Sequence, residues 1–374
     1  MPVNPLSLYI HFPWCIQKCP YCDFNSHAVK DTIPEKNYIE VLLRDLARDI
    51  EFFQETRPLQ SIFMGGGTPS LFSATELERL LGGIQQQLDF ADNIEITLEA
   101  NPSTFESQKF IDYRQIGINR LSIGVQSFHP HHLKRLGRIH SAQEAIEAAH
   151  IAREAGFDNL NLDLMFGLPN STLTESIADI KQAIALRPTH LSFYQLTLEP
   201  NTYFYKYPPK LPDEDHIFTA QLACQDILEA HGYIQYEVSA YAQDTKQCQH
   251  NINYWSFGDY LGIGAGAHGK INHTRTSKVK RPEHYLQENQ QDRQYEVIVP
   301  EDLPLEFLMN HLRLKKGFNL STFVARTGLN SHCLQQSLEQ CLHENLLQKH
   351  GEQYLCTEKG WHFLDSILEK FLNL

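Results

Sequence analysis

Short apolar segments alternate with longer amphipathic ones from Leu6 to about Gln243, and this alternation constrains the fold most strongly. The apolar segments are LSLYIHF, SIFMGG, IEITLEANP, NRLSIGVQSF, LNLDLMFGLP and HLSFYQLTLEP. Segments with helical periodicity separate them, for example KNYIEVLLRDLARDIEFF and TESIADIKQAI. Near-continuous apolar strands separated by helices indicate a parallel sheet that is buried on both faces. Six such units with right-handed crossovers form either a curled, barrel-like sheet or an open doubly wound one.

Distinctive polar or glycine-rich residues follow most of the predicted strands. A cysteine loop follows the first strand and GGGTPS follows the second, while EANP, GVQSF and DLMFGLP end the next three. Because function gathers at the carboxyl ends of parallel strands, we expect these groups to meet at one rim of the sheet.

Composition narrows the class of partner. The formal net charge of −13 argues against nucleic acid, because binding phosphates needs a basic face. Eight cysteines without a pairing pattern, and an N-terminus without a signal peptide, predict a reducing cytoplasm. No stretch of about 18 uninterrupted apolar residues occurs, so we expect no membrane span, while peripheral membrane association stays open.

The chain changes character after GDYLGIGAGAHG. Helical segments follow, and LLQKHGEQYLCTEKG predicts a β-hairpin around His350 and Gly351. Helix, helix, hairpin and helix are typical of a winged-helix module, although no helix here concentrates basic charge for DNA. We therefore expect a βα domain over residues 1–245, a connecting segment over 246–300, and a C-terminal helical, winged-helix-like domain over 301–374.

Three cysteines lie on the loop after the first strand, at Cys15, Cys19 and Cys22. They can hold zinc with His11 or His27 as a fourth ligand, form a redox dithiol from Cys19 and Cys22, or hold an iron–sulfur cluster. The zinc and dithiol readings leave the glycine-rich GGGTPS loop unexplained. A cluster held by three cysteines leaves one iron open for a chelating ligand.

The spacing C-x3-C-x2-C, with the aromatic Phe24 shortly after, resembles the signature of radical S-adenosylmethionine (SAM) enzymes. In that family the cysteines hold three irons of a [4Fe–4S] cluster, and the fourth iron binds the amino and carboxylate groups of SAM. The resemblance implies an α/β fold, a partial (β/α)6, TIM-like radical SAM barrel followed by the C-terminal domain.

The resemblance also implies a set of SAM-binding positions. Gly66, Gly67 and Thr68 of GGGTPS match the loop that cradles the methionyl ammonium through backbone groups. The further matching positions, each of which also suits an ordinary strand-end polar residue, are Tyr9 beside the methionine part, Glu99, Gln126, Arg138 for the carboxylate, and Asp163 for the ribose hydroxyls.

From Tyr9 to at least Gly269 the chain is similar to the oxygen-independent coproporphyrinogen dehydrogenase branch, which converts propionate side chains to vinyl groups in heme synthesis. Two departures favour a related heme chaperone branch. Phe24 stands where the dehydrogenase pattern has a fourth cysteine, and Cys15 lies too close to the start for that enzyme's N-terminal extension.

The segment HNINYW, from His250 to Trp255, matches a pattern associated with heme in the chaperone branch. A neutral imidazole is a good axial ligand for heme iron, and Tyr254 and Trp255 offer rings for the porphyrin face. We interpret His268 as structural. The remaining cysteines are interpreted as packing thiols: Cys224, Cys248, Cys333, Cys341 and Cys356.

We therefore expect a cytoplasmic heme chaperone that binds heme, a [4Fe–4S] cluster and SAM and delivers heme to client hemoproteins. In this interpretation the cluster and SAM stabilise a homodimer or gate heme transfer. The alternatives are coproporphyrinogen dehydrogenase itself and a zinc-stabilised α/β protein with neither function.

Overall fold

The computed structural model describes residues 4–103, 108–287 and 293–372, and its central element is a twelve-stranded mixed sheet. Six neighbouring strands run parallel and correspond to the six predicted strands. They are β1 (Leu6–Phe12), β4 (Leu59–Gly66), β5 (Phe90–Ala100), β6 (Arg120–Gln126), β7 (Asn159–Phe166) and β8 (His190–Gln195). The predicted α/β class is confirmed.

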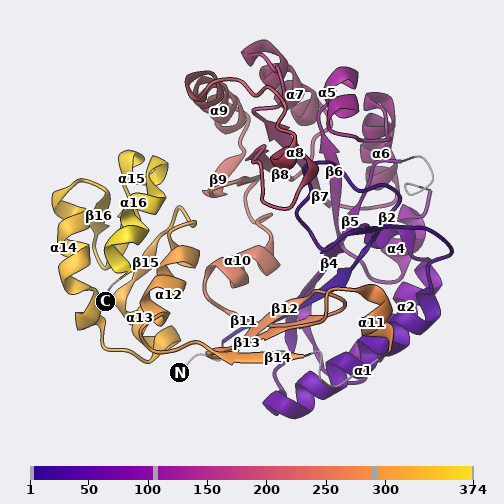
Figure 1. Ribbon diagram of the computed structural model, residues 1–374, viewed down its shortest axis with the longest axis horizontal. Coiled ribbons are helices and arrows are strands. Elements are labelled where there is room, and N and C mark those ends of the chain that lie inside the picture. The colour runs from indigo at the N-terminus through magenta and orange to yellow at the C-terminus, as the bar shows by residue number, and fades with distance from the viewer. Residues whose placement is uncertain (1–3, 104–107, 288–292, 373–374) are drawn as a thin grey trace.

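A helix follows each of these strands before the next one begins. These helices are α1 (Glu35–Phe53), α2 (Ala74–Gln85), α4 (Phe110–Gln115), α6 (Ala142–Glu154), α7 (Leu173–Ala185) and α9 (Glu214–Ala230). Capping boxes start two of them, because Ser141 pairs with Glu144 in α6 and Thr172 pairs with Glu175 in α7. Figure 1 shows the helices along the outer side of the curved sheet.

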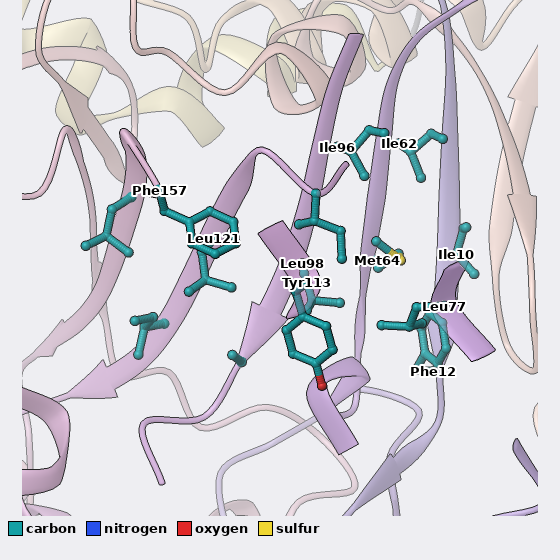
Figure 2. Packing of buried hydrophobic residues seen from close by; sticks show 14 of the residues in the cluster. Ile10, Phe12, Ile62, Met64, Leu77, Ile96, Leu98, Tyr113, Leu121 and Phe157 are labelled. Atoms are coloured by element: carbon teal, nitrogen blue, oxygen red, sulfur yellow. The ribbon is translucent and has the colours of Figure 1, made fainter. Parts of the chain in front are cut away.

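The two faces of the sheet differ in chemistry. The outward-facing side chains are apolar and pack beneath the helices, as Figure 2 shows for Ile10, Met64 and Leu98. Their neighbours in each strand point to the opposite, concave face. Most side chains there are polar: Ser7, Tyr9, Ser61, Glu99, Ser122, Asn161, Asp163 and His190. The prediction that these strands are buried on both faces is confirmed for most of their residues, but the buried concave face is largely polar and carries the candidate site.

The sheet extends beyond the six parallel strands at both ends. Next to β1 lies a seventh parallel strand, β11 (Asp259–Ile263), followed by antiparallel β12 (His268–Ile271), β13 (Thr274–Ser277) and β14 (Gln294–Val297). Antiparallel β10 (Ala240–Ala242) and β9 (Ile234–Glu237) extend the other end. Within the described residues no strand pairing joins β14 to β9, so the barrel is partial.

A short helix, α10 (Gln249–Trp255), crosses the concave side of the sheet and contacts β1, β4 and β11. It carries the HNINYW segment. Figure 1 shows α10 between the sheet and the C-terminal helices. The Arg313 guanidinium lies 4.3 Å from the centroid of the Trp255 ring, so α10 also contacts the C-terminal module.

The C-terminal module has its own hydrophobic core around Phe307 and Phe323. Its elements are α12 (Leu303–His311), β15 (Phe318–Asn319), α13 (Leu320–Thr327), α14 (Gln335–His343), β16 (Leu347–His350), β17 (Gln353–Cys356), α15 (Glu358–His362) and α16 (Leu364–Leu368). The predicted hairpin is confirmed as the β16–β17 pair, and β15 completes a three-stranded sheet. Among the described helices, none has the length and apolar character that crossing a bilayer would require.

Candidate functional site

The cysteine loop is closed by a small parallel ladder between β2 (Trp14–Cys15) and β3 (His27–Ala28). The backbone N–H of His27 donates to the Pro13 carbonyl at 2.7 Å, which ties the two ends of the loop together. Cys15, Cys19 and Cys22 all line one small cavity of about 140 Å³ at the carboxyl ends of the strands. The GGGTPS turn and the predicted acidic residues line the same cavity, so the expected rim exists.

Each of the three sulfurs has a polar side chain nearby. The Thr68 hydroxyl donates to Cys15 Sγ at 3.5 Å, Arg138 donates to Cys19 Sγ at 3.6 Å, and Ser26 Oγ lies 3.6 Å from Cys22 Sγ. Burial raises the pKa of the Cys15 thiol to about 11. Burial also raises the pKa of the Cys22 thiol. Cys15 and Cys22 are therefore protonated in the free loop, and binding a metal there would release those protons.

The histidines weighed as zinc ligands differ from the cysteines in their environment. His11 uses both ring nitrogens, since Nδ1 lies 3.0 Å from the Tyr9 hydroxyl and Nε2 lies 2.9 Å from the Asn25 carbonyl. His27 Nε2 lies 3.3 Å from Asn25 Oδ1. His11 is therefore already satisfied by the protein. The donor set that the loop offers is three sulfurs, which suits an iron–sulfur cluster.

The glycine turn packs against the chain's own backbone. The N–H of Gly67 donates to the Phe12 carbonyl at 2.7 Å, and the N–H of Thr68 donates to the Trp14 carbonyl at 2.8 Å. A Cβ added at Gly67 would lie 2.5 Å from the Phe12 oxygen, and Gly66 has a φ of +101°. The sequence argument assigned the close approach to a ligand, whereas here β1 and β2 approach the turn. Because these N–H groups already donate to backbone carbonyls, the turn would contact a ligand through its carbonyl oxygens.

Two carboxyl groups face the small cavity. Burial, with the nearby charge of Asp163, raises the pKa of Glu99 to about 8, although the Gly66 N–H donates to Glu99 Oε2 at 3.2 Å. Burial also raises the pKa of Asp163, although Asn161 Nδ2 donates to it at 2.7 Å. Two poorly solvated acids at one cavity favour a cationic ligand, because a nearby positive charge stabilises their ionised forms.

Arg138 supplies the opposite charge to this cavity. Its Nη2 donates to Asn101 Oδ1 at 2.6 Å and to the Gly124 carbonyl at 2.7 Å, which ties the guanidinium to two strand ends. Its Nε is buried and has no hydrogen-bond partner. A buried donor without a partner is uncommon and marks a place where a carboxylate ligand would be stabilised.

Gln126 ends β6 with a positive φ of 69°. Its Oε1 accepts a hydrogen bond from the Tyr194 hydroxyl at 2.6 Å. Sequence reasoning missed Tyr194 and Asn101, both of which line the cavity. A signal for Tyr194 was present, because the alternation in HLSFYQ places it on the same face as His190 and Ser192.

A larger cavity of about 830 Å³ adjoins the small one. The two cavities share Cys22, Phe24, Ser26, Gly66 and Glu99. Phe24 is 58% exposed, so its ring stands at the border instead of packing into the core. Tyr9 was predicted to contact SAM, but it lines the larger cavity and not the smaller one.

The HNINYW segment forms part of the wall of the larger cavity, because His250, Tyr254 and Trp255 all line it. His268, which the sequence analysis read as structural, lines this cavity too, together with Tyr260. The sequence places these residues far from Tyr9 and Phe63, and the fold brings them to the same wall.

One serine contacts the His250 ring, and a second serine accepts a hydrogen bond from the first. The Nδ1 of His250 lies 3.1 Å from Ser61 Oγ, and Ser61 Oγ donates to Ser7 Oγ at 2.8 Å. Because Ser61 already donates to Ser7, its oxygen accepts from an Nδ1–H, which leaves the Nε2 lone pair free to bind a metal. Burial, with the charge of Arg120, lowers the pKa of His250 to about 3, so the ring is neutral.

Cys248 lies behind α10. Its thiol is buried, and its Sγ lies 3.5 Å from Glu95 Oε1. Cys248 does not line the larger cavity, whereas His250 and Trp255 do. Among the described residues, His250 is therefore better placed than Cys248 to meet a ligand in that cavity.

Comparisons with known proteins agree with this arrangement. Residues 9–183 match the radical SAM superfamily, and residues 298–363 match the HemN C-terminal domain. The heme chaperone HemW of Haemophilus influenzae is 50% identical, over 99% of this chain and 98% of its own length. The chain belongs to the HemW family of radical SAM proteins. HemW of Escherichia coli is 48% identical over 98% of both chains.

The chain shares its fold with a solved enzyme. The structure of coproporphyrinogen III oxidase (HemN) from Escherichia coli, a radical SAM enzyme, superposes with a TM-score of 0.84 at 22% sequence identity. The superposition covers 99% of this chain and 91% of that enzyme. The resemblance to the radical SAM family, and within it to the heme chaperone branch, is confirmed, as is the predicted partial barrel with its C-terminal module.

Proposed function

We propose that this chain is a heme chaperone that holds heme in the larger cavity and delivers it to hemoproteins. The observation that carries the proposal is the pairing of His250 with Ser61 in the wall of that cavity. A neutral imidazole whose Nδ1 is oriented by a hydrogen bond presents Nε2 as a metal ligand. The HemW relatives, which are named heme chaperones, support the same role.

The size and lining of the larger cavity suit a macrocycle. Its volume of about 830 Å³ lies within the range of sites that enclose organic ligands. Tyr9, Phe63, Tyr254 and Trp255 provide aromatic surface for a flat apolar ring. At the rim, the exposed Lys280 supplies a positive charge for the propionate groups of heme.

We further propose that Cys15, Cys19 and Cys22 hold a [4Fe–4S] cluster and that SAM occupies the small cavity. SAM carries an ammonium, a sulfonium and a carboxylate. Glu99 would accept from the ammonium, Arg138 would pair with the carboxylate, and Asp163 would accept from the ribose hydroxyls. When bound, the cluster would supply an electron to the sulfonium, the chemistry that gives the superfamily its name.

The shared wall gives the two cavities a way to influence each other. Phe24 and Glu99 border both, so a ligand that moves either side chain changes the shape or charge of the neighbouring cavity. In this proposal SAM and the cluster gate heme transfer or stabilise a homodimer in the cytoplasm. Size-exclusion chromatography of the reconstituted protein with and without SAM tests the dimer.

Heme titrations test the main proposal. Wild type, His250→Ala and a Cys15/Cys19/Cys22→Ala triple variant are titrated with heme and followed by Soret absorbance, with exposed His231→Ala as the control. We expect the triple variant and the control to bind as wild type does, and His250→Ala to bind more weakly or with a shifted Soret band. A wild-type spectrum and affinity for His250→Ala would refute the ligand role.

The alternative function is coproporphyrinogen dehydrogenase, whose fold the chain shares. Phe24, which stands at the position of that enzyme's fourth cysteine, argues against it. Anaerobic incubation with coproporphyrinogen III, SAM and a reductant decides between the two. We expect no protoporphyrinogen IX, and its accumulation would overturn the chaperone proposal in favour of the enzyme.

A further inference from the structure

A cluster of histidines lies on the outer side of the barrel, away from both cavities. The sequence HPHH, residues 129–132, forms the start of α5 (Pro130–Arg135) directly after β6. Figure 1 shows α5 beside α7. One potential ligand atom from each of His129, His131 and Glu175 lies within 4.8 Å of the other two. Imidazole nitrogens with a carboxylate are donors that zinc and its neighbours in the first transition row accept.

Glu175 presents its uncapped carboxylate oxygen to His131. Its Oε2 accepts from the N–H and the hydroxyl of Thr172, both at 2.9 Å, as part of the capping box of α7. Its Oε1 lies 3.0 Å from Nε2 of His131, whose side chain is 47% exposed. The cap fixes the carboxylate in place, while the exposed histidine can adjust to a bound ion.

His132 adds a donor from the buried side. It is 1% exposed, and its Nε2 lies 3.5 Å from Glu175 Oε2 without hydrogen-bond geometry. Both of its ring nitrogens are buried and lack a hydrogen-bond partner. Buried polar atoms are nearly always paired, so this ring needs an explanation that an ordinary surface ion pair does not supply. A metal ion bound by one of the nitrogens would supply it.

A second carboxylate stands behind the cluster. Asp179 Oδ1 lies 3.8 Å from His129 Nε2. Asp179 is itself held by Ser127 Oγ and by the Phe128 N–H, both at 2.7 Å. Carboxylates placed behind metal-binding histidines orient the ring and strengthen its basicity.

We infer that His129, His131 and Glu175 bind a divalent first-row transition metal ion, with zinc a good match to two imidazoles and one carboxylate, and that the unpaired His132 turns toward the ion as a fourth donor. Donor atoms around a tetrahedral zinc lie about 3.3 Å apart, given bonds of about 2.0 Å. The separation of 3.0 Å between His131 Nε2 and Glu175 Oε1 is close to this value, whereas His132 Nε2 lies 3.5 Å from the other oxygen and would have to move toward the ion. The alternative is a metal-free set of ion pairs, in which His131 and His132 pair with Glu175 and His129 pairs with Asp179.

Such an ion would clamp α5 onto α7, and the end of α5 leads to Arg138 in the small cavity. The N–H of Arg138 donates to the carbonyl of Leu133, in α5, at 2.9 Å. Arg138 in turn donates to Cys19. A metal at the start of α5 would therefore stabilise the segment that positions Arg138.

Zinc titration calorimetry tests the inference on the full-length Cys15/Cys19/Cys22→Ala chain, so that the loop thiols do not compete. We expect one equivalent of zinc to bind and to raise the melting temperature. His131→Ala and Glu175→Gln should each weaken binding at least tenfold, since loss of even a supporting partner costs roughly 10–100-fold. Glutamine can still cap α7, so Glu175→Gln should stay folded.

Exposed His231→Ala, at the end of α9, is the matched control and should bind zinc as the parent does. The inference is overturned if the folded parent binds no stoichiometric zinc. It is equally overturned if His131→Ala and Glu175→Gln bind zinc with the affinity of the parent.

Discussion

Ser61 on β4 and His250 on α10 are 189 positions apart in sequence, and their Oγ and Nδ1 atoms lie 3.1 Å apart. The hydrogen bond fixes the tautomer and the tilt of the imidazole ring. The backbone N–H of His250 also donates to Glu95 Oε1 at 3.2 Å, so the start of α10 is tied to two neighbouring strands. The ring lies 5.2 Å from that of Phe63, which limits its rotation further.

Ser61→Ala should weaken heme binding although the proposed ligand is intact. Without the serine oxygen, the His250 ring loses its orienting acceptor, and supporting partners of this kind contribute roughly 10–100-fold to metal affinity. Soret titration measures the loss, and Ser321→Ala in the C-terminal module is the control. Equal affinities of Ser61→Ala and Ser321→Ala would show that the hydrogen bond does not support a ligand.

Alanine at Cys15, Cys19 or Cys22 should abolish the visible absorption of the anaerobically reconstituted cluster. In the proposed site each thiolate would bind a different iron, and the loop offers no equivalent sulfur in its place. Cys333→Ala should retain the absorption, because Cys333 is exposed on the C-terminal module. A comparable loss of visible absorption in Cys333→Ala would contradict the assignment of the cluster to the loop.

Gly67→Val should destabilise the folded protein itself, so a loss of SAM binding in this variant would not identify the SAM site. The sequence argument predicted weaker SAM binding in a folded variant, but the new side chain would meet the Phe12 and Trp14 carbonyls at 2.5 and 2.6 Å. Inserting atoms into packed structure typically costs about 1–3 kcal/mol. Urea denaturation compares it with Gly82→Ala, where the added methyl meets open space. An unchanged midpoint for Gly67→Val would contradict the packing argument.

The elements that sequence alone could predict are those with local signals. Hydrophobic periodicity placed the six parallel strands, and the turn at His350 and Gly351 placed the β16–β17 hairpin. Periodicity did not reveal that the concave face is polar, because Ser61 or Asp163 within an apolar segment looks like an isolated exception. The alternation becomes visible only when the registers of several strands are aligned.

The parts of the candidate site that form contiguous sequence motifs could be predicted. The parts that the fold assembles from distant residues could not. The cysteine loop and GGGTPS are short, ordered motifs, and both line the small cavity. The neighbourhood of Tyr9 and His250 depends on α10 crossing the concave side of β1 and β4, for which no local pattern exists. The same holds for Asn101, whose role is visible only in the fold, where its Oδ1 accepts a hydrogen bond from Arg138.

Glu99→Gln should stabilise the ligand-free protein at alkaline pH and have little effect near pH 5. Burial and the charge of Asp163 raise the pKa of Glu99 from 4.5 to about 8 in the folded state. Below the unfolded value both states are protonated, and the favourable contribution of the neutral acid is fully present. As the pH rises through 4.5 to 8, the unfolded chain ionises first, so this contribution is lost.

Glutamine stays neutral throughout and can still accept from the Gly66 N–H. One pKa unit corresponds to about 1.4 kcal/mol, and because Glu99 is partly accessible we expect a gain of about 1–3 kcal/mol at pH 8.5. Urea denaturation at pH 5 and 8.5 measures it. SAM should shrink the difference at pH 8.5, because its ammonium stabilises the ionised carboxylate. A gain of the same size at both pH values would show that Glu99 is not the group that titrates.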